Sequence, residues 1–344
     1  MTTLSASEDR VPQRPERGLF DAEDIANLEG QEMTPSAFAR ALGRDLATLY
    51  RELREGQKCR LHVFDMATRS DTIIAEFDDV CFEAPNWGPD GDTLYLNGQG
   101  GLWAFPLDSP SEPRRIEYEG IPAALNNDHV LDPRGKAIFL SAMDGHIYHG
   151  ALDGGSTRRV TDEDKVWHFL HGISPDGNTL GFIRIEPAGG PGKLAFIASE
   201  GGRITPMDTG TGHADGIEWS PDGVWIYFNT ERWASEPGHA QLARVPSKDP
   251  AAEKIERLIS TDTVDWFPHF APDGRFAVYL QYPAGTVGHP EDLDVELVVV
   301  DTADWAAPVA RRPLFGGQGT INVNSWSPDS QRFAFVTYPL ETGE

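Results

Sequence analysis

The chain has 344 residues, and 29 Lys and Arg stand against 54 Asp and Glu, which gives a formal net charge of −25. This charge excludes a nucleic-acid binder and a protein that docks on an anionic membrane surface, because both need a basic face. Hydrophobic residues make up 39% of the chain, including 9 Trp and 17 Phe, which is enough for a large core and excludes global disorder.

The first 57 residues form an N-terminal extension that does not fit the pattern of the rest of the chain. Residues 1–18 are polar and contain no apolar stretch like that of a secretory signal peptide, so a cytoplasmic protein is expected. A helix is predicted over residues 35–55 from the near-helical spacing of Phe38, Leu42, Leu46, Leu49 and Leu53. We expect the extension to pack on the remaining domain or to join copies of the chain as a homo-oligomer.

The sequence contains two cysteines, Cys59 and Cys81, which make no C-x-x-C pair. A disulfide framework is therefore excluded, as is a zinc site built on cysteine pairs. No apolar run approaches the roughly 18 residues of a membrane span.

From residue 58 onward one motif recurs, in which a Pro-Asp-Gly turn separates two runs of strand-forming residues. The copies read NWGPDGDTLYL, HVLDPRGKAIFL, HGISPDGNTLGFI, IEWSPDGVWIYF, PHFAPDGRFAVYL and NSWSPDSQRFAFV. Their prolines are Pro89, Pro133, Pro175, Pro221, Pro272 and Pro328. Proline presets the first corner of such a turn, Asp caps it and Gly takes the positive φ. A period of about 40 to 50 residues with short strands is typical of β-propeller blades.

Two further strands follow each copy except the sixth, after which the chain ends. The missing pair, CRLHVFDMAT and SDTIIAEFD, precedes the first copy. We therefore predict an all-β protein, a six-bladed β-propeller over residues 58–344. Its ring closes when the N-terminal strands pair in the last blade, which leaves no long unpaired sheet edge.

Polar residues gather four to ten places before each of these prolines, where the innermost strand of each blade lines the central channel. Four of the ten histidines fall in these windows and a fifth, His269, lies one residue nearer to its proline, whereas random placement would put about one in the windows. We predict a ligand or metal site formed by His171, His213, His269 and Gln318, and acid/base groups among His129, Asp215 and His168. Substrate contacts are predicted for Asn127, Trp167, Glu218, Asp265, Trp266, Thr320 and Asn322.

Imidazoles with amide oxygens and a few carboxylates suit Mn, Fe, Ni or Zn, whereas Ca prefers more oxygen ligands. Trp167 and Trp266 are candidates to stack on a sugar ring. The competing interpretation is that the polar residues bind ordered water in the channel and that the aromatic residues belong to the core. The acidic stretches TDEDK (161–165) and HPEDLDVE (289–296) are expected to be solvated loops.

The W-S-P-D-G repeats resemble the TolB-like six-bladed propellers. The segments NNDHVLDPRG, HADGIEWSPDG, DWFPHFAPDG and LFGGQGTINVNSWSPDS are similar to bacterial proteins described as Tol-type biopolymer transporter components. The oligogalacturonate lyases, a related group, hold a divalent metal, commonly manganese, with three histidines and a glutamine. That resemblance implies His171, His213, His269 and Gln318 as metal ligands, and His129 or Asp215 as the base of a β-elimination.

The expected function is therefore that of a carbohydrate-active enzyme, a metal-dependent lyase or hydrolase that acts on an oligosaccharide or modified sugar in the central channel. The alternative is a non-catalytic propeller that binds a protein or another ligand. Convergence of the named histidines on one ion or ligand distinguishes the enzyme from the binding protein.

Overall fold

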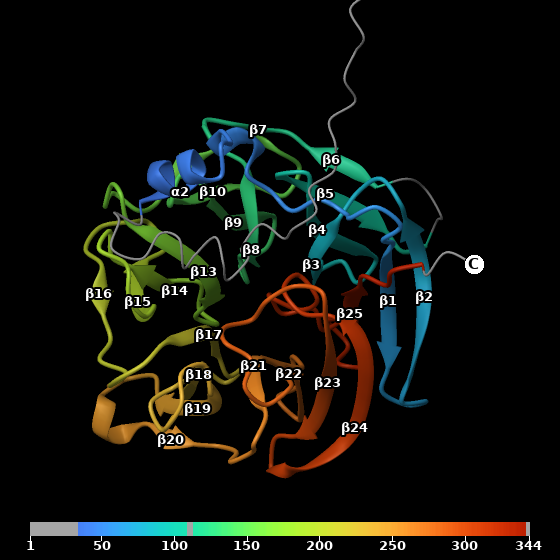
Figure 1. Ribbon diagram of the computed structural model, residues 1–344, viewed down its shortest axis with the longest axis vertical. Helices are drawn as coiled ribbons and strands as arrows, with labels where there is room; N and C mark the ends of the chain where they lie inside the picture. Colours follow the sequence, from blue (N-terminus) through green and yellow to red (C-terminus); the bar gives the residue numbers. More distant parts are fainter. Residues whose placement is uncertain (1–33, 109–112, 342–344) are drawn as a thin grey trace, which may run out of the picture.

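Six β-sheets surround a central axis in the computed structural model, which describes residues 34–108 and 113–341 (Figure 1). The expected six-bladed propeller is confirmed. Within the described residues, no helix has the length and apolar character needed to cross a membrane. The predicted polar segment 1–18 lies outside the described residues, so the extension is described only from residue 34.

The first five blades each contain four antiparallel strands that are consecutive in the chain, apart from a short extra pair. Blade one comprises β3 (Phe82–Trp87), β4 (Thr93–Gly98), β5 (Gly101–Pro106) and β6 (Arg114–Ile116). Blade two comprises β8 (Leu125–Leu131), β9 (Ala137–Ala142), β10 (Ile147–Ala151) and β12 (Arg158–Arg159). The extra pair is β7 (Tyr118–Glu119) with β11 (Gly155–Ser156), and it is parallel.

The next three blades repeat this plan. Blade three comprises β13 (Trp167–Ile173), β14 (Thr179–Ile185), β15 (Lys193–Ala198) and β16 (Thr205–Pro206). Blade four comprises β17 (Ala214–Trp219), β18 (Trp225–Thr230), β19 (Gln241–Pro246) and β20 (Glu256–Arg257), with the 3-10 turn η2 (Ala252–Lys254) before β20. Blade five comprises β21 (Val264–Phe270), β22 (Phe276–Tyr282), β23 (Leu293–Asp301) and β24 (Asp304–Gly316).

The Pro-Asp-Gly turns join the first strand of a blade to the second. In blade four the Ser220 hydroxyl donates to Asp222 (2.6 Å) and accepts from the Trp225 backbone N–H (2.9 Å). The Asp222 carboxylate in turn accepts the Val224 N–H. Because each turn satisfies its own polar groups in this way, the turn fixes the register of the strands on either side.

The sixth blade combines the two ends of the domain. Its sheet has the order β2 (Ser70–Phe77), β1 (Cys59–Asp65), β25 (Arg332–Thr337), and an isolated bridge from Trp326 to Phe333 adds the innermost segment. Strands β1 and β25 pair antiparallel over six residues. The ring is thus closed by main-chain hydrogen bonds between segments about 270 residues apart.

The N-terminal extension is less helical than its sequence pattern predicts. Helix α2 (Pro35–Ala41) begins at Thr34, whose hydroxyl accepts the Ala37 N–H, and it ends before Gly43, which has a φ of +64°. A single 3-10 turn, η1 (Leu46–Thr48), follows. Leu49 and Leu53 are buried, but in an irregular segment rather than on a helix face. The left-handed backbone at Gly43 stops the helix.

Candidate functional site

The innermost strands of the first five blades share a bulge at corresponding positions. The register shifts between Glu83 and Asn86, Leu125 and His129, Leu170 and Gly172, Asp215 and Glu218, and Trp266 and His269. Ala84, Gly216 and Phe267 have φ values of +50°, +62° and +55° at these bulges. A bulge turns side chains that would otherwise follow the pleat, and here it brings residues of different blades together at the axis.

A buried cluster of imidazoles and carboxylates occupies the axis. His171 Nε2 lies 3.0 Å from Asp215 Oδ1 and 3.8 Å from Asp128 Oδ1, and its Nδ1 lies 3.2 Å from the Asn322 carbonyl. The other oxygen of Asp215 accepts from His213 Nε2 at 2.9 Å. Four different blades therefore contribute to a single hydrogen-bonded network.

The charges in this cluster are strongly coupled. Burial alone would lower the pKa of His171, but the carboxylates of Asp128 and Asp215 raise it to about 9. Burial would raise the pKa of Asp215, yet His171 and His213 hold it well below its usual range. Burial raises the pKa of Asp128 to about 6, and Oδ1 of this residue is buried without a hydrogen-bond partner. The cluster is an imidazolium between one ionised carboxylate and one that is readily protonated.

Amide side chains extend the network toward one mouth of the channel. Gln318 Oε1 accepts from Asn322 Nδ2 (2.9 Å) and lies 2.5 Å from His289 Nδ1. The Asn127 side chain donates to Glu83 (3.2 Å) and accepts from Gln318 Nε2 (3.4 Å). Five side chains from separate parts of the chain thus connect the cluster at the axis to the mouth.

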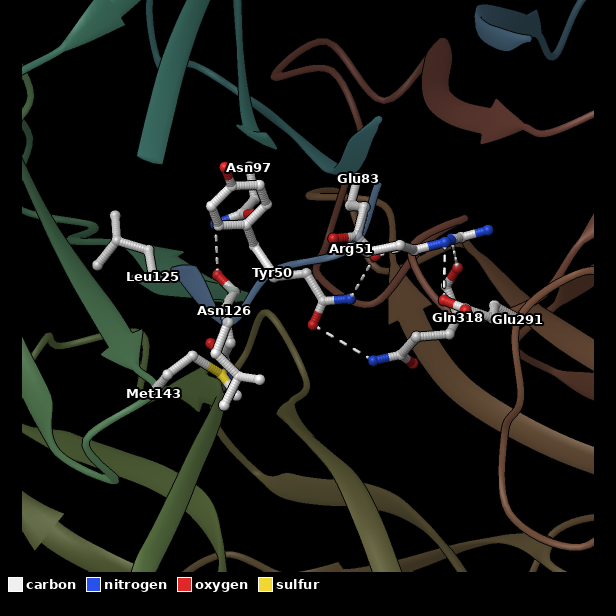
Figure 2. A pocket seen from close by; sticks show the side chains of 11 residues that line it. Tyr50, Arg51, Glu83, Asn97, Leu125, Asn126, Met143, Glu291 and Gln318 are labelled. Carbon is white, nitrogen blue, oxygen red and sulfur yellow. Dashed lines mark hydrogen bonds and ion pairs between the residues drawn. The ribbon is translucent and has the colours of Figure 1, made fainter. Parts of the chain in front are cut away.

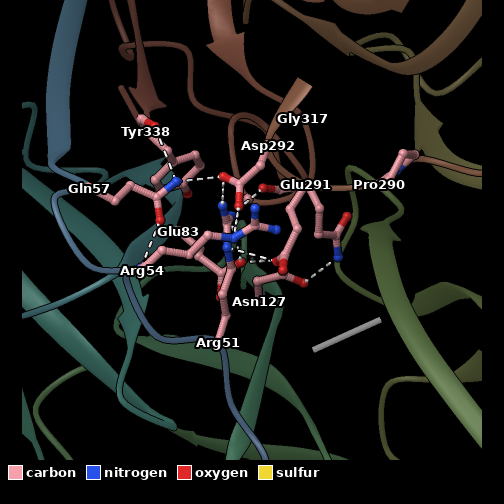
Figure 3. A network of polar contacts seen from close by, with 12 residues as sticks. Arg51, Arg54, Gln57, Glu83, Asn127, Pro290, Glu291, Asp292, Gly317 and Tyr338 are labelled. Atoms are coloured by element: carbon pink, nitrogen blue, oxygen red, sulfur yellow. Dashed lines mark hydrogen bonds and ion pairs between the residues drawn. The ribbon is translucent and has the colours of Figure 1, made fainter. Parts of the chain in front are cut away.

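Residues 49–57, which we call the strap, lie at that mouth, where Arg51, Arg54 and Gln57 contact Asp292 (Figure 3). The Arg51 guanidinium of the strap lies 2.7 Å from Glu291 Oε2, 2.9 Å from Asp292 Oδ1 and 2.7 Å from the Gln318 carbonyl. It also lies 3.9 Å above the ring of Tyr338. Burial alone would lower the pKa of Arg51, but the nearby carboxylates raise it well above its ordinary value. The strap is thus held in the channel by a buried, charged anchor.

Acidic groups exceed basic ones around this anchor. Glu83 Oε1 lies 3.7 Å from Arg51, and burial raises the pKa of this carboxyl to about 7. Asp292 also contacts Arg54 (2.9 Å) and accepts from Gln57 (2.6 Å). Two arginines therefore face three carboxyl groups in a buried environment, where an unpaired charge is strongly destabilising.

A small cavity remains between the strap and the channel (Figure 2). Its volume is about 20 Å³, and Tyr50, Arg51, Glu83, Asn127 and Gln318 are among the side chains that line it. This is room for about one water molecule. A sugar ring does not fit beside the strap in this arrangement.

The residues predicted as metal ligands do not suit that role as they stand. Both ring nitrogens of His171 face acceptors, and so do those of His269, which lie 2.6 Å from Glu218 Oε2 and 2.6 Å from the Ile321 carbonyl. His213 accepts the Gly192 N–H at Nδ1. The nitrogen lone pairs that a metal needs are thus occupied, and His269 lies outside the cluster. Across residues 34–108 and 113–341, no three His, Cys, Asp or Glu side chains are grouped to hold a metal ion.

The three predicted acid/base residues lie in separate environments. Asp215 belongs to the central cluster. His129 is buried, neither of its ring nitrogens has a hydrogen-bond partner, and burial lowers its pKa to about 4. His168 lies at the seam between blades two and three, where Nδ1 is 2.5 Å from the Gly145 carbonyl.

The predicted substrate contacts also divide. Asn127 and Asn322 belong to the network, and Trp266 lies beside His213 and His289, at ring-centroid distances of 5.7 and 4.4 Å. The other four have structural partners. Trp167 packs on Phe38 of α2, and Thr320 accepts the Gly317 N–H. Glu218 accepts from the Asn324 side chain and the Phe270 N–H, and Asp265 contacts Thr261, Gln241 and Gln281.

Sequence reasoning missed the residues that close the mouth. The acidic stretch 289–296 was expected to be a solvated loop, but the side chains of Glu291 and Asp292 are only 10% and 4% exposed. The signal available was the 56-residue spacing between the last two prolines, the longest of the series, within which His289, Glu291 and Asp292 lie. Nothing in the sequence marked Arg51 as their partner.

Comparison with known proteins supports the fold. No family model matches the chain. The chain is 34% identical over 304 residues to the uncharacterized protein Atu1656 of Agrobacterium fabrum (strain C58), which spans 86% of this chain and 99% of that relative.

A protein of Agrobacterium tumefaciens, whose structure was solved under the provisional name TolB, is 33% identical with a TM-score of 0.74. The match covers 82% of this chain and 99% of the solved one. An oligogalacturonate lyase in complex with manganese is 13% identical with a TM-score of 0.47 over 78% of this chain and 70% of that chain. That last similarity is too weak to carry an argument about chemistry.

Proposed function

Because the chain belongs to the family of TolB-like six-bladed β-propellers, we propose that it is a binding propeller whose channel mouth recognises a guanidinium group. The ligand is an arginine-bearing segment of a protein partner, and the strap occupies the same site in its absence. The observation that carries this proposal is the burial of Arg51 among Glu291, Asp292 and the Gln318 carbonyl.

The partners of Arg51 favour arginine over any other cation. Three acceptors lie around the planar guanidinium, and the Tyr338 ring lies 3.9 Å from its central carbon. An ammonium group is a point charge and cannot make this forked set of hydrogen bonds or stack on the ring in the same way. Recognition at the mouth is therefore specific for guanidinium geometry.

Replacement of the strap by a partner is favoured because the acidic groups around Arg51 outnumber the arginines. Buried ion pairs add little net stability compared with apolar packing, because both charges lose their hydration. The third acid, Glu83, exceeds the two arginines, and burial keeps it partly protonated near neutral pH by raising its pKa to about 7. A partner that brings a further cation to this mouth would relieve that excess.

The experiment uses the full chain with Arg51→Ala and, as a matched control, Arg44→Ala, because Arg44 lies in the same extension but pairs with Glu52 near the surface. Loss of a buried charge partner is expected to destabilise R51A by roughly 3–5 kcal/mol. Millimolar methylguanidinium should restore the melting temperature of R51A, whereas methylammonium should not. Equal shifts in R51A and R44A would rule out a guanidinium site.

A second measurement tests exchange in the wild-type protein. A peptide with the sequence of residues 46–57 should increase hydrogen exchange at the amides of the strap, and the same peptide with Lys in place of both arginines should not. If the strap stays protected at saturating arginine peptide, its role is structural and the proposal fails.

A second candidate function, a carbohydrate-active enzyme, is favoured by the unpartnered Oδ1 of Asp128 beside His171. A carboxyl with a pKa of about 6 next to an imidazolium is suited to proton transfer on a sugar once the strap is displaced. Oligosaccharide cleavage by wild-type protein that is lost in Asp128→Asn would support this function. Absence of cleavage across neutral and acidic oligosaccharides would remove it.

A further inference from the structure

The strap fits the channel mouth through alternate side chains. Leu49, Arg51 and Leu53 are buried, whereas Tyr50 is half-buried and Glu52 is exposed. This alternation is that of an extended chain, in which every second side chain points to the same face. Within residues 34–108 and 113–341, no backbone–backbone hydrogen bond joins residues 49–53 to a blade. The identity of the inward side chains therefore determines which segment can occupy this place.

Leu49 occupies an apolar site at the junction of blades two and three. It belongs to one buried cluster with Ala124, Met143 and Trp167. Phe38 of α2 completes this cluster by packing edge-on against Trp167, at a ring-centroid distance of 5.9 Å and an interplanar angle of 83°. Because that packing does not involve the strap, the site keeps its walls when another segment takes the place of Leu49.

Leu53, two residues after Arg51, occupies a second apolar site. It belongs to the cluster formed by blades one and six, which includes Val80, Cys81 and Tyr338. The Tyr338 ring also lies 3.9 Å from the central carbon of the Arg51 guanidinium. One side chain thus forms a wall of both sites, so an arginine and an apolar residue two positions later are recognised together.

We infer that the channel mouth recognises an extended segment that carries an apolar side chain two residues before and two residues after its arginine. This inference rests on the guanidinium site proposed above, and it adds two apolar subsites that select among arginine-bearing partner segments. The second arginine of the strap is a weaker determinant. Arg54 lies 2.9 Å from Asp292, but its side chain is 35% exposed, and solvent-exposed ion pairs contribute little.

The apolar subsites are needed because the strap is tethered to the propeller. A ligand joined by a short connection has an effective concentration in the millimolar range, so a separate segment with an arginine alone would compete poorly with it. Each leucine that becomes fully buried is expected to strengthen binding roughly 10–100-fold. Two apolar residues thus supply the affinity that displacement of the strap requires.

The test uses the full chain with Leu49→Ala, Arg51→Ala and Leu53→Ala combined, because the strap of this variant has lost its three anchors. Isothermal titration calorimetry measures binding of a peptide with the sequence of residues 46–57. Peptides with Leu49→Ala or with Leu53→Ala should each bind roughly 10-fold or more weakly than the parent peptide. The matched control is the Glu52→Ala peptide, which should bind like the parent, because Glu52 is exposed and its partner Arg44 lies outside the peptide.

A further peptide separates the spacing of the anchors from their composition. A glycine inserted between residues 52 and 53 keeps every side chain but turns Leu53 toward the opposite face of an extended chain. This peptide should bind as weakly as the Leu53→Ala peptide. Affinity equal to that of the parent would overturn the alternating pattern.

Hydrogen exchange of the strap amides in the wild-type protein ranks the same peptides without any substitution in the chain. The parent and Glu52→Ala peptides should increase exchange at the strap, and peptides that lack either leucine should increase it less. Circular dichroism verifies that the combined variant folds; if it does not, the ranking in the wild type decides.

Two outcomes distinguish a failure of this inference from a failure of the proposed function. Equal effects of the parent, Leu49→Ala and Leu53→Ala peptides, together with a weaker Arg51→Lys peptide, would overturn the apolar subsites and leave the guanidinium site intact. Equal effects of the parent and Arg51→Lys peptides would overturn the guanidinium site, and this inference with it.

Discussion

The protonation of His171 shows how a single residue can hold charges from several blades together. It contacts carboxylates from blade two and blade four and a carbonyl from the innermost segment of blade six. Its doubly protonated ring can donate to Asp215 and to the Asn322 carbonyl at once, which a neutral imidazole cannot do, and Asp128 lies within ion-pair distance of the same ring. His171 therefore acts as a cation at the centre of an otherwise acidic channel.

We predict that this cation makes stability depend on pH. The folded-state pKa of His171, about 9, lies above its unfolded value of 6.5, so its contribution is fully present below pH 6.5 and is lost as pH rises through 9. The free energy of unfolding should fall by up to about 3 kcal/mol over this range. Urea denaturation at several pH values measures it, and His171→Gln should flatten the slope between pH 7 and 9.

His149→Gln serves as the control for this experiment, because burial lowers the pKa of His149 below its ordinary value of 6.5 and the residue does not change charge between pH 7 and 9. This variant should keep the wild-type slope. If H171Q and H149Q have the same slope as the wild type between pH 7 and 9, His171 is not charged in the folded protein.

The windows before each proline predicted where polar residues gather but not where their side chains point. His168 and His171 are three residues apart in the same strand, a spacing that places side chains on opposite faces of a regular strand. His168 contacts Gly145 at the seam, and His171 contacts Asp215 at the axis. The bulge between Leu170 and Gly172 changes the alternation of side chains. Its position depends on contacts with neighbouring blades, which a single sequence does not reveal.

At the scale of elements, a β-bulge recurs in the innermost strand of each of the first five blades. The left-handed backbone appears at Ala84, Gly216 and Phe267, and glycine is present at one of these three positions. At Gly216 a Cβ would lie 2.6 Å from Asn229 Oδ1 and 3.1 Å from the Phe267 ring. The bulge of blade four thus requires glycine for space as well as for backbone conformation.

Gly216→Ala should destabilise the protein by more than about 1 kcal/mol, because the new methyl group meets its neighbours and the backbone is strained. Ala84→Gly should be nearly neutral, because relief of the left-handed strain offsets the lost methyl group and the more flexible unfolded chain. Thermal and urea denaturation measure both.

The control for Ala84→Gly is Ala195→Gly in β15, where an equally buried alanine has an ordinary strand conformation. This variant should lose about 1 kcal/mol or more, because a strand glycine has no strain to relieve. Equal losses in A84G and A195G would show that the backbone at residue 84 is unstrained.

In the N-terminal extension, the sequence pattern predicted the local structure incorrectly. Leu42, Leu46, Leu49 and Leu53 have helical spacing, but the helix ends at Ala41. Leu46 is half-buried in a 3-10 turn, and Leu49 and Leu53 are buried in irregular chain. Arg51 finds its partner 241 residues away in Asp292. A local pattern cannot report a contact of this range, so the strap had no signature in the sequence.

For the whole molecule, the Pro-Asp-Gly repeats were sufficient to predict six blades and the position of each innermost strand. Long-range pairing of β1 with β25 then determines whether the ring is closed. Phe333 of β25 stacks on Phe64 of β1 at 4.8 Å and lies 5.0 Å from Trp326, and all three side chains are buried. This aromatic group joins the two ends of the domain.

Phe333→Ala should lower the free energy of unfolding by about 3–5 kcal/mol, the usual loss for a buried phenylalanine. It should also increase hydrogen exchange in β1 more than elsewhere, because the closing sheet loses its packing. Phe182→Ala in blade three removes an equally buried ring, and there β1 should remain protected. Equal hydrogen exchange of the β1 amides in the two variants would mean that Phe333 does not specifically stabilise the closing sheet of blade six.

The pairing of β1 with β25 also sets the order of events during synthesis. The hairpin of β1 and β2 leaves the ribosome with one edge unpaired, and its partner strand β25 is translated about 270 residues later. Earlier blades can fold as they emerge, since domains and their parts fold while translation proceeds. The circle, however, is completed only after β25 has been translated, so the nascent protein carries an exposed sheet edge while the five intervening blades are made.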